Sequence, residues 1–144
     1  MSLSDKRILI IEDNVVNMKL FTLMLETAGY TVWGAENAEV GLPMVEERQP
    51  DLILMDIGLP GIDGLEATRR LKQNPRTRHI PVVAVTAHSL HSDREQALAA
   101  GCSDFLAKPS RMKDFLDCVA ANLSRASTFS PSSDEATAES QGRM

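Results

Sequence analysis

Short apolar runs alternate along this chain with longer segments in which apolar residues recur at helical spacing. Four runs, at residues 8–11, 52–55, 82–85 and 105–107, lead directly into polar residues, which are respectively Glu12 with Asp13, Asp56, Thr86 and Lys108. Apolar runs of this length between helical segments are typical of parallel strands buried on both faces. The pattern therefore predicts a buried sheet whose strands end in side chains capable of chemistry.

Strand and helix patterns follow one another in strict alternation. We expect strands at residues 7–11, 31–33, 52–56, 82–86 and 104–107, with helices at 15–28, 37–48, 65–73 and 93–100 and a last helix around 112–123. Right-handed crossovers between parallel strands place such helices on both faces of the sheet. The predicted fold class is thus α/β, a (βα)5 doubly wound five-stranded parallel sheet.

Two segments depart from this regular pattern. Pro43 lies inside the second predicted helix, and because proline has no N–H to donate to the carbonyl of Glu39, we expect a kink or an irregular first turn there. Residues 126–144 are rich in Ser, Thr, Asp and Glu and show no periodicity. This composition predicts a disordered polar tail after a folded domain at residues 6–124. A solvated end is the simpler interpretation, and a regulatory or docking tail is the alternative.

Length and charge narrow the class of function. A chain of 144 residues with 43% hydrophobic residues favours one globular domain, and its net charge of -5 weighs against binding nucleic acid or an anionic membrane. No apolar run approaches the roughly 20 residues of a membrane span, and the first strand begins too early to leave room for a signal peptide. We therefore expect a cytoplasmic protein in which Cys102 and Cys118 are reduced, packed thiols.

The polar residues that follow the strands are expected to converge. In an open parallel sheet, ligands bind just beyond the carboxyl ends of the strands, so three acids, a hydroxyl and an ammonium group should share one cleft. The carboxylates of Glu12, Asp13 and Asp56 are hard oxygen donors that suit Mg²⁺ or Mn²⁺. The Asp56 carboxylate can attack phosphorus to form an aspartyl phosphate. The cation, Lys108 and the Thr86 hydroxyl would then stabilise the charge on the phosphoryl group.

These residues lie in motifs that resemble the receiver domain of bacterial response regulators. The motifs are Glu12-Asp13, Asp56 within residues 54–64, Thr86-Ala87 and Lys108-Pro109, and the resemblance spans about residues 6–124. The run from Asp13 to Leu20 further resembles the single-domain regulators of the DivK type. The resemblance implies a flavodoxin-like (CheY-like) fold. It also implies a phosphoacceptor signalling domain rather than an enzyme, with intrinsic Mg²⁺-dependent autophosphorylation and autodephosphorylation.

The resemblance also implies a role for each site residue. Asp56 would accept a phosphoryl group from a histidine kinase or a histidine phosphotransfer protein. The implied Mg²⁺ ligands are the carboxylates of Glu12, Asp13 and Asp56 and the backbone carbonyl of Gly58. Thr86 and Lys108 would contact the phosphoryl group.

Thr86 and Phe105 match the two switch positions of such domains. By the resemblance, their movement alters the surface formed by the last two helices and the last strand, where a downstream effector protein would bind. The residues after the domain are too few and too polar to form an output domain, so output through protein contacts or onward transfer of phosphate is expected. For Phe105 the alternative is an ordinary packed strand residue.

Two positions depart from the commonest receiver pattern. Gly58 and His88 flank the expected phosphoryl group, and because Gly58 leaves room for water, we expect faster hydrolysis of the aspartyl phosphate. A haloacid-dehalogenase-like phosphohydrolase would need a second acid at the position of Gly58. A nucleotide- or flavin-binding flavodoxin relative would need a Gly/Ser/Thr-rich phosphate cradle where Glu12, Asp13 and Asn14 stand. A receiver that serves only for docking is disfavoured by the intact set of acids.

Overall fold

The computed structural model describes residues 6–86, 91–108 and 111–128, in which five strands alternate with five helices. The elements are β1 (Arg7–Ile11), α1 (Val15–Thr27), β2 (Thr31–Ala35), α2 (Ala38–Arg48), β3 (Leu52–Asp56), α3 (Gly64–Gln73), β4 (Val82–Thr86), α4 (His91–Ala100), β5 (Asp104–Ala107) and α5 (Met112–Thr128). All five predicted strands are confirmed, and β2 extends two residues beyond its predicted end.

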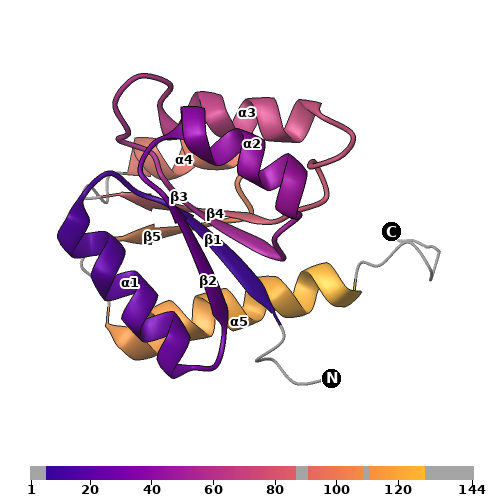
Figure 1. Cartoon of the computed structure of the whole chain (residues 1–144). Coiled ribbons are helices and arrows are strands. Elements are labelled where there is room, and N and C mark those ends of the chain that lie inside the picture. The colour runs from indigo at the N-terminus through magenta and orange to yellow at the C-terminus, as the bar shows by residue number, and fades with distance from the viewer. Residues whose placement is uncertain (1–5, 87–90, 109–110, 129–144) are drawn as a thin grey trace.

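The strands form one parallel sheet in the order β2-β1-β3-β4-β5. Helices α1 and α5 cover one face, and α2, α3 and α4 cover the other (Figure 1). The predicted (βα)5 doubly wound fold is therefore confirmed. Because the chain winds outward from β1 to β2 and then returns to β3 on the other side, the direction of winding reverses between β1 and β3. Such a reversal opens a crevice at the carboxyl ends of these two strands.

The apolar core consists of two layers separated by the sheet. Along β1, Leu9 and Ile11 pack toward α2, α3 and α4, whereas Ile8 and Ile10 pack toward α1 and α5. Every residue of β3 and β4 is buried, so these strands need apolar side chains on both faces along most of their length. Burying each such side chain contributes about 1.5–3 kcal/mol, which fixes the strand ends that carry the site.

Helix α2 runs without a break from Ala38 to Arg48 and its first turn is regular, so the predicted irregular first turn is wrong, whereas the kink expected as its alternative stays a prediction. Asn37 caps the helix by accepting the Val40 N–H, and the Gly41 N–H bonds to the Asn37 carbonyl at 3.0 Å as in a regular first turn. A Cβ atom at Gly41 would lie 2.6 Å from the Ile11 side chain, which shows how closely α2 packs on β1. This cap and close packing offset the one helical hydrogen bond that Pro43 cannot make.

The end of the chain differs in part from the sequence-based expectation. Helix α5 continues to Thr128, so the first three residues assigned to the polar tail are helical. Residues 129–144 lie outside the described residues, and their disorder stays a prediction. Within the described ranges, no helix is long and apolar enough to cross a membrane. Cys102 and Cys118 are both free, and Cys102 is buried in the core as expected.

Candidate functional site

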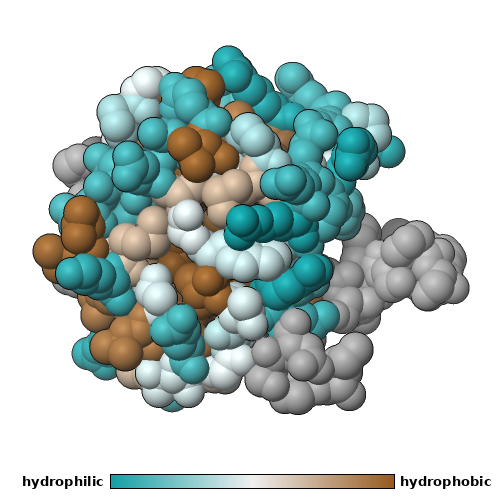
Figure 2. Space-filling model, in the orientation of Figure 1, coloured by the Kyte–Doolittle hydropathy of each residue, from teal (hydrophilic) through white to brown (hydrophobic). Residues whose placement is uncertain are grey.

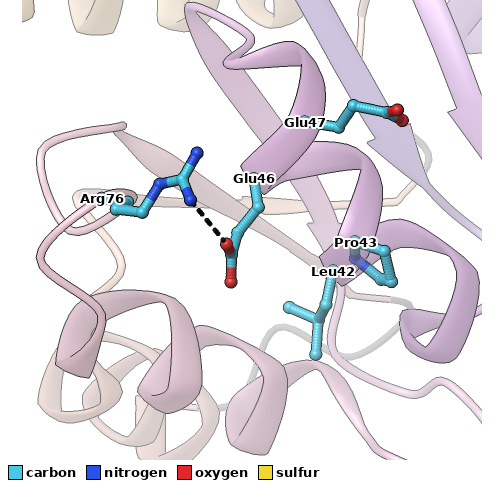
Figure 3. Close-up of a pocket in the computed structure, with 5 residues that line it drawn as sticks. All are labelled: Leu42, Pro43, Glu46, Glu47 and Arg76. Atoms are coloured by element: carbon cyan, nitrogen blue, oxygen red, sulfur yellow. Dashed lines mark ion pairs between the residues drawn. The ribbon is translucent and has the colours of Figure 1, made fainter.

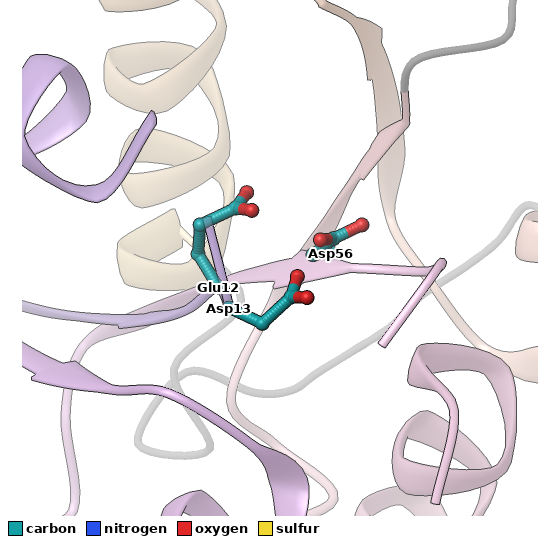
Figure 4. Close-up of side chains that lie close together, drawn as sticks. All are labelled: Glu12, Asp13 and Asp56. Carbon is teal, nitrogen blue, oxygen red and sulfur yellow. The ribbon is translucent and has the colours of Figure 1, made fainter. Parts of the chain in front are cut away.

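Three carboxylates meet at the crevice between β1 and β3. Glu12 and Asp13 directly follow β1, and Asp56 is the last residue of β3 (Figure 4). One oxygen from each carboxylate lies within 4.8 Å of the other two. Glu12 and Asp56 are buried, whereas Asp13 is exposed, so the cluster lies at the floor of the crevice and opens to solvent on one side. The predicted convergence of the acids is confirmed.

Lys108 reaches the same cluster from the end of β5. Its Nζ lies 2.8 Å from Glu12 Oε1 and 3.4 Å from Asp56 Oδ2, and its side chain is only 13% exposed. The backbone N–H of Lys108 donates to the Thr86 carbonyl at 2.6 Å, which places both residues beside the end of β3. The ammonium group therefore bridges two buried acids from neighbouring strands.

The cluster carries more negative than positive charge. Three carboxylates and one ammonium leave a formal charge of -2 at this point of the fold. Glu12 Oε1 is buried and accepts no hydrogen bond of good geometry within the described residues, so its contact with Lys108 is an ion pair without a directed bond. An excess of buried carboxylate oxygen is the environment that a divalent cation with oxygen ligands satisfies.

The pKa of Asp56 reflects the competition within this cluster. Burial raises the pKa of Asp56 above its usual range, and the nearby charge of Glu12 raises it further. Two contacts act in the opposite direction, namely the hydrogen bond from the Gly58 N–H and the charge of Lys108. A carboxylate that is hard to ionise gains most from an added cation, because the cation favours the charged form.

Two glycines shape the loop that follows Asp56. The Gly58 N–H donates to Asp56 Oδ1 at 2.9 Å, and a Cβ atom at Gly58 would meet only that oxygen, at 3.6 Å. At Gly64, by contrast, a Cβ atom would lie 2.3 Å from the Asp56 carbonyl oxygen. Gly64 thus allows the start of α3 to lie against the end of β3. The place of Gly64 directly after Asp63, the cap of α3, is the sequence signal for this close approach.

The two proposed switch positions occupy different environments. Thr86 ends β4 and is 4% exposed, next to the strand that carries Asp56. Phe105 is half-buried and packs against the core layer on the side of α2, α3 and α4. This packing is compatible with either interpretation of Phe105. His88 lies outside the described residues.

Together, the fold and this cluster define the class of the protein. A parallel (βα)5 sheet with three acids and a lysine at its carboxyl edge is a flavodoxin-like, CheY-like domain built around an acidic, metal-compatible site. The family model "Response regulator receiver domain" matches residues 8–120. The chain therefore belongs to the receiver domain family of response regulators in two-component systems, a family of signalling domains.

The relatives in sequence include single-domain regulators. The chain is 42% identical to the polar-differentiation response regulator DivK of Brucella anthropi over 118 residues, which cover 82% of this chain and 96% of that protein. It is 41% identical to DivK of Brucella ovis over the same shares of the two chains. The resemblance to DivK-type regulators is thus confirmed.

Solved structures show the same architecture. The receiver domain of the sensor histidine kinase PA1611 from Pseudomonas aeruginosa, which has a magnesium ion coordinated in its active site cleft, superposes with a TM-score of 0.78. It is 35% identical over 83% of this chain and 98% of that chain. A response regulator from Chloroflexus aurantiacus gives a TM-score of 0.81 at 32% identity, over 83% of this chain and 98% of that chain. The chemotaxis protein CheY4 of Vibrio cholerae, at 20% identity and a TM-score of 0.77 over 81% of this chain and 98% of that chain, shares the fold.

Proposed function

We propose that this chain is a phosphoacceptor switch of a two-component phosphorelay, in which Asp56 accepts a phosphoryl group from a histidine kinase or a histidine phosphotransfer protein. One observation carries the proposal. The Asp56 carboxylate lies within 4.8 Å of two further acids and 3.4 Å from a buried ammonium group, at the open end of a receiver-family sheet. A nucleophilic carboxylate, a cation site and a fixed positive charge are the parts that phosphoryl transfer requires.

The metal in this proposal is Mg²⁺, for which Mn²⁺ could substitute because it prefers the same oxygen ligands. The ligands would be the carboxylates of Glu12, Asp13 and Asp56 and the backbone carbonyl of Gly58. The donor set fits, because a dication balances the formal charge of -2 left by three acids and one lysine. When bound, the cation supplies positive charge against the oxygens of the transferred phosphoryl group.

The residues of the chain itself would then orient the reacting carboxylate. The Gly58 N–H holds Asp56 Oδ1, while Oδ2 faces Lys108. In the transfer, the bond from phosphorus to the imidazole nitrogen of the donor breaks as a bond to an Asp56 oxygen forms. Lys108 would stabilise the negative charge of the phosphoryl oxygens. Thr86 pairs with Ala107, the residue before Lys108, and its hydroxyl would donate a hydrogen bond to the same oxygens.

Exposed apolar side chains beside the site support a docking surface for the phosphodonor. Helix α1 begins two residues after Asp13, and Val15, Val16, Leu20 and Leu23 on this helix are 67%, 72%, 43% and 63% exposed. Figure 2 shows brown, hydrophobic areas at the left of the molecule, where Figure 1 places α1. Apolar side chains exposed together on one helix mark a protein contact surface. The helix of a phosphodonor that packs here would bring its histidine to Asp56.

Output in this proposal passes through α4, β5 and α5. Phosphorylation of Asp56 would draw Thr86 toward the phosphoryl group and Phe105 inward, and an effector protein would recognise the altered surface. A cytoplasmic location and the absence of nucleic-acid and membrane partners belong to the same proposal.

The test is direct labelling of Asp56. The protein is incubated with Mg²⁺ and acetyl phosphate, and the added phosphoryl group is measured by intact mass, with Asp56→Asn as the matched control. We expect labelling that requires the divalent cation and is absent in Asp56→Asn. Labelling that persists in the variant would defeat the assignment, and turnover of generic phosphate esters would favour a phosphohydrolase instead.

A further inference from the structure

Positive charge is concentrated in one segment of this acidic chain. Residues 67–92 hold five of the 15 Lys and Arg residues and no Asp or Glu, although the whole chain has a net charge of -5. All five lie between residues 69 and 78, on the second half of α3 and on the connection that leads to β4. The proposed phosphorylation site is at the opposite, carboxyl end of the sheet, so the phosphoacceptor function does not account for this charge.

Four of these residues are exposed, and we define them together as the basic surface: Arg69, Arg70, Arg76 and Arg78. The side chains of Arg69, Arg70 and Arg76 are 50%, 51% and 70% exposed. The connection is held against α3 because Lys72 Nζ donates to the carbonyls of Arg78 at 3.1 Å and Ile80 at 2.6 Å. The arginines are therefore presented from a fixed backbone.

Neighbouring acids neutralise only part of this surface. Glu66 pairs with both Arg69 and Arg70, at 3.4 Å and 3.1 Å, and Glu46 pairs with Arg76 at 3.6 Å. Arg78 forms no ion pair within the described part of the chain. Beside Arg76 the surface continues into a shallow hollow against α2, which Leu42, Pro43 and Glu47 also line (Figure 3). The four arginines outnumber the two acids that pair with them, so the surface keeps a net positive charge.

The end of α5 lies at the same end of the sheet as this basic surface. Ser103 Oγ donates to Asn122 Oδ1 at 2.7 Å, and the Ser103 N–H bonds to the Val82 carbonyl at 2.8 Å. Val82 begins β4, only four residues after Arg78. Figure 1 shows the yellow end of α5 and the connection from α3 to β4 on the same side of the molecule.

The segment that follows α5 has the opposite charge and sufficient reach. Residues 129–144 contain Asp134, Glu135 and Glu139 against the single base Arg143. From Asn122 the helix runs six residues, about 9 Å, to its last residue. The four residue steps from Arg78 to Val82 span at most about 14 Å. Because extended chain covers ~3.3 Å per residue, the eleven residue steps from Thr128 to Glu139 span up to about 36 Å, enough to cover these two distances and the contacts between them.

We propose that the acidic segment at residues 129–144 docks in cis on the basic surface of Arg69, Arg70, Arg76 and Arg78. Each ion pair at an exposed surface is weak, but a short tether raises the effective concentration of the segment to about the millimolar range. Docking of this kind is sensitive to salt, because the Debye length falls from about 10 Å at 0.1 M to about 3 Å at 1 M.

The test compares the full chain with a chain ended after Thr128, by the backbone amide chemical shifts of residues 74–80. We expect these shifts to differ between the two chains at low salt and to coincide in about 0.5 M salt. The triple variant Asp134→Asn, Glu135→Gln, Glu139→Gln keeps the length of the segment and should reproduce the shifts of the shortened chain. The double variant Arg76→Ala, Arg78→Ala removes part of the basic surface. In this variant the amide shifts of the full chain and of the chain ended after Thr128 should coincide.

Arg111→Ala is the matched control, because Arg111 is exposed and three residues from Lys108, at the other end of the sheet. In this variant the difference between the full and shortened chains should be unchanged. Identical shifts in the two chains at low salt would overturn the proposal. Shift differences that grow with protein concentration would also overturn it, since they would show docking between two copies. Labelling of Asp56 by acetyl phosphate should be the same in all these variants.

Discussion

Replacing Gly64 by alanine tests the close contact between α3 and the strand that carries Asp56. The added Cβ atom would lie 2.3 Å from the Asp56 carbonyl oxygen and 2.6 Å from the Ile57 Cα atom. Carbon and oxygen atoms in ordinary contact are about 3.3–3.6 Å apart, so the start of α3 and the end of β3 must separate by roughly 1 Å. Both neighbouring groups are backbone, and no flexible side chain can move aside.

The expected cost is both a loss of stability and a loss of function. Overpacking of this kind lowers the free energy of unfolding by about 1–3 kcal/mol, which for a domain of this size lowers the Tm by roughly 4–12 °C. Because Asp56 lies at the displaced strand end, labelling by acetyl phosphate should slow by about 10- to 100-fold. Thermal unfolding followed by circular dichroism and a time course of intact mass measure the two effects.

Gly58→Ala is the matched control in the same loop. Its Cβ atom would stand 3.6 Å from Asp56 Oδ1, an ordinary contact, so the Tm should change little. If Gly64→Ala unfolds and is labelled like the wild type, the contact at Gly64 does not position Asp56 and the reasoning is refuted. An equal loss of stability in both variants would refute it as well, since it would show a general effect of losing glycine in this loop.

Three further predictions concern other groups. Gly58→Gln should slow the loss of the phosphoryl group from Asp56, because the glutamine side chain would occupy the space open to water. A time course of intact mass after removal of acetyl phosphate checks this, and a loss as fast as in the wild type would contradict it. Burial, followed by the charge of Asp104, raises the pKa of Cys118 to about 12, so alkylation by iodoacetamide near pH 8 should be slow and should become faster in Asp104→Asn. Burial of Asp104 works against its ionisation, but hydrogen bonds from the next backbone N–H, Asn122 and Cys118 and the charge of Arg125 outweigh it and lower the pKa of Asp104. A lowered pKa in the native state contributes stability that is present above the unfolded pKa of about 3.9 and is lost as the pH falls through the native pKa. In Asp104→Asn the free energy of unfolding should therefore fall less steeply with decreasing pH in the acid range than it does in the wild type.

The sequence predicts the central strands well because their burial leaves a plain signal. Strands β3 and β4 are buried at every residue, and an uninterrupted apolar run has no other simple explanation in a chain of this composition. At the edge of the sheet the signal weakens. The residues Gly34 and Ala35 complete β2, but Gly34 is exposed and has low strand propensity, so the pattern alone ended the strand at Trp33.

The sequence predicts which residues meet at the site, because the topology of the sheet alone determines this. Side chains after parallel strands meet at one edge, and this rule was enough to bring Glu12, Asp56 and Lys108 together. The rule carries no distances, so neither the 2.8 Å contact of Lys108 with Glu12 nor the approach of Gly64 to the Asp56 carbonyl followed from it. These contacts depend on how closely α3 and β5 pack, which is a property of the assembled core.

The acidic cluster shows why the site, rather than the core, departs from the rules of stable folding. Glu12 and Asp56 are buried acids that repel one another, and a single lysine is shared between them. Burying carboxylates with too few partners costs free energy, and apolar residues of similar size at these strand ends would give a more stable fold. The cost falls on residues that face the crevice, while the layers on either side of the sheet consist mainly of apolar side chains. Buried charges with too few partners are expected at a binding site, where their function outweighs their cost in stability. The acidic cluster therefore indicates the same site as the topology does, the crevice at the carboxyl ends of β1 and β3.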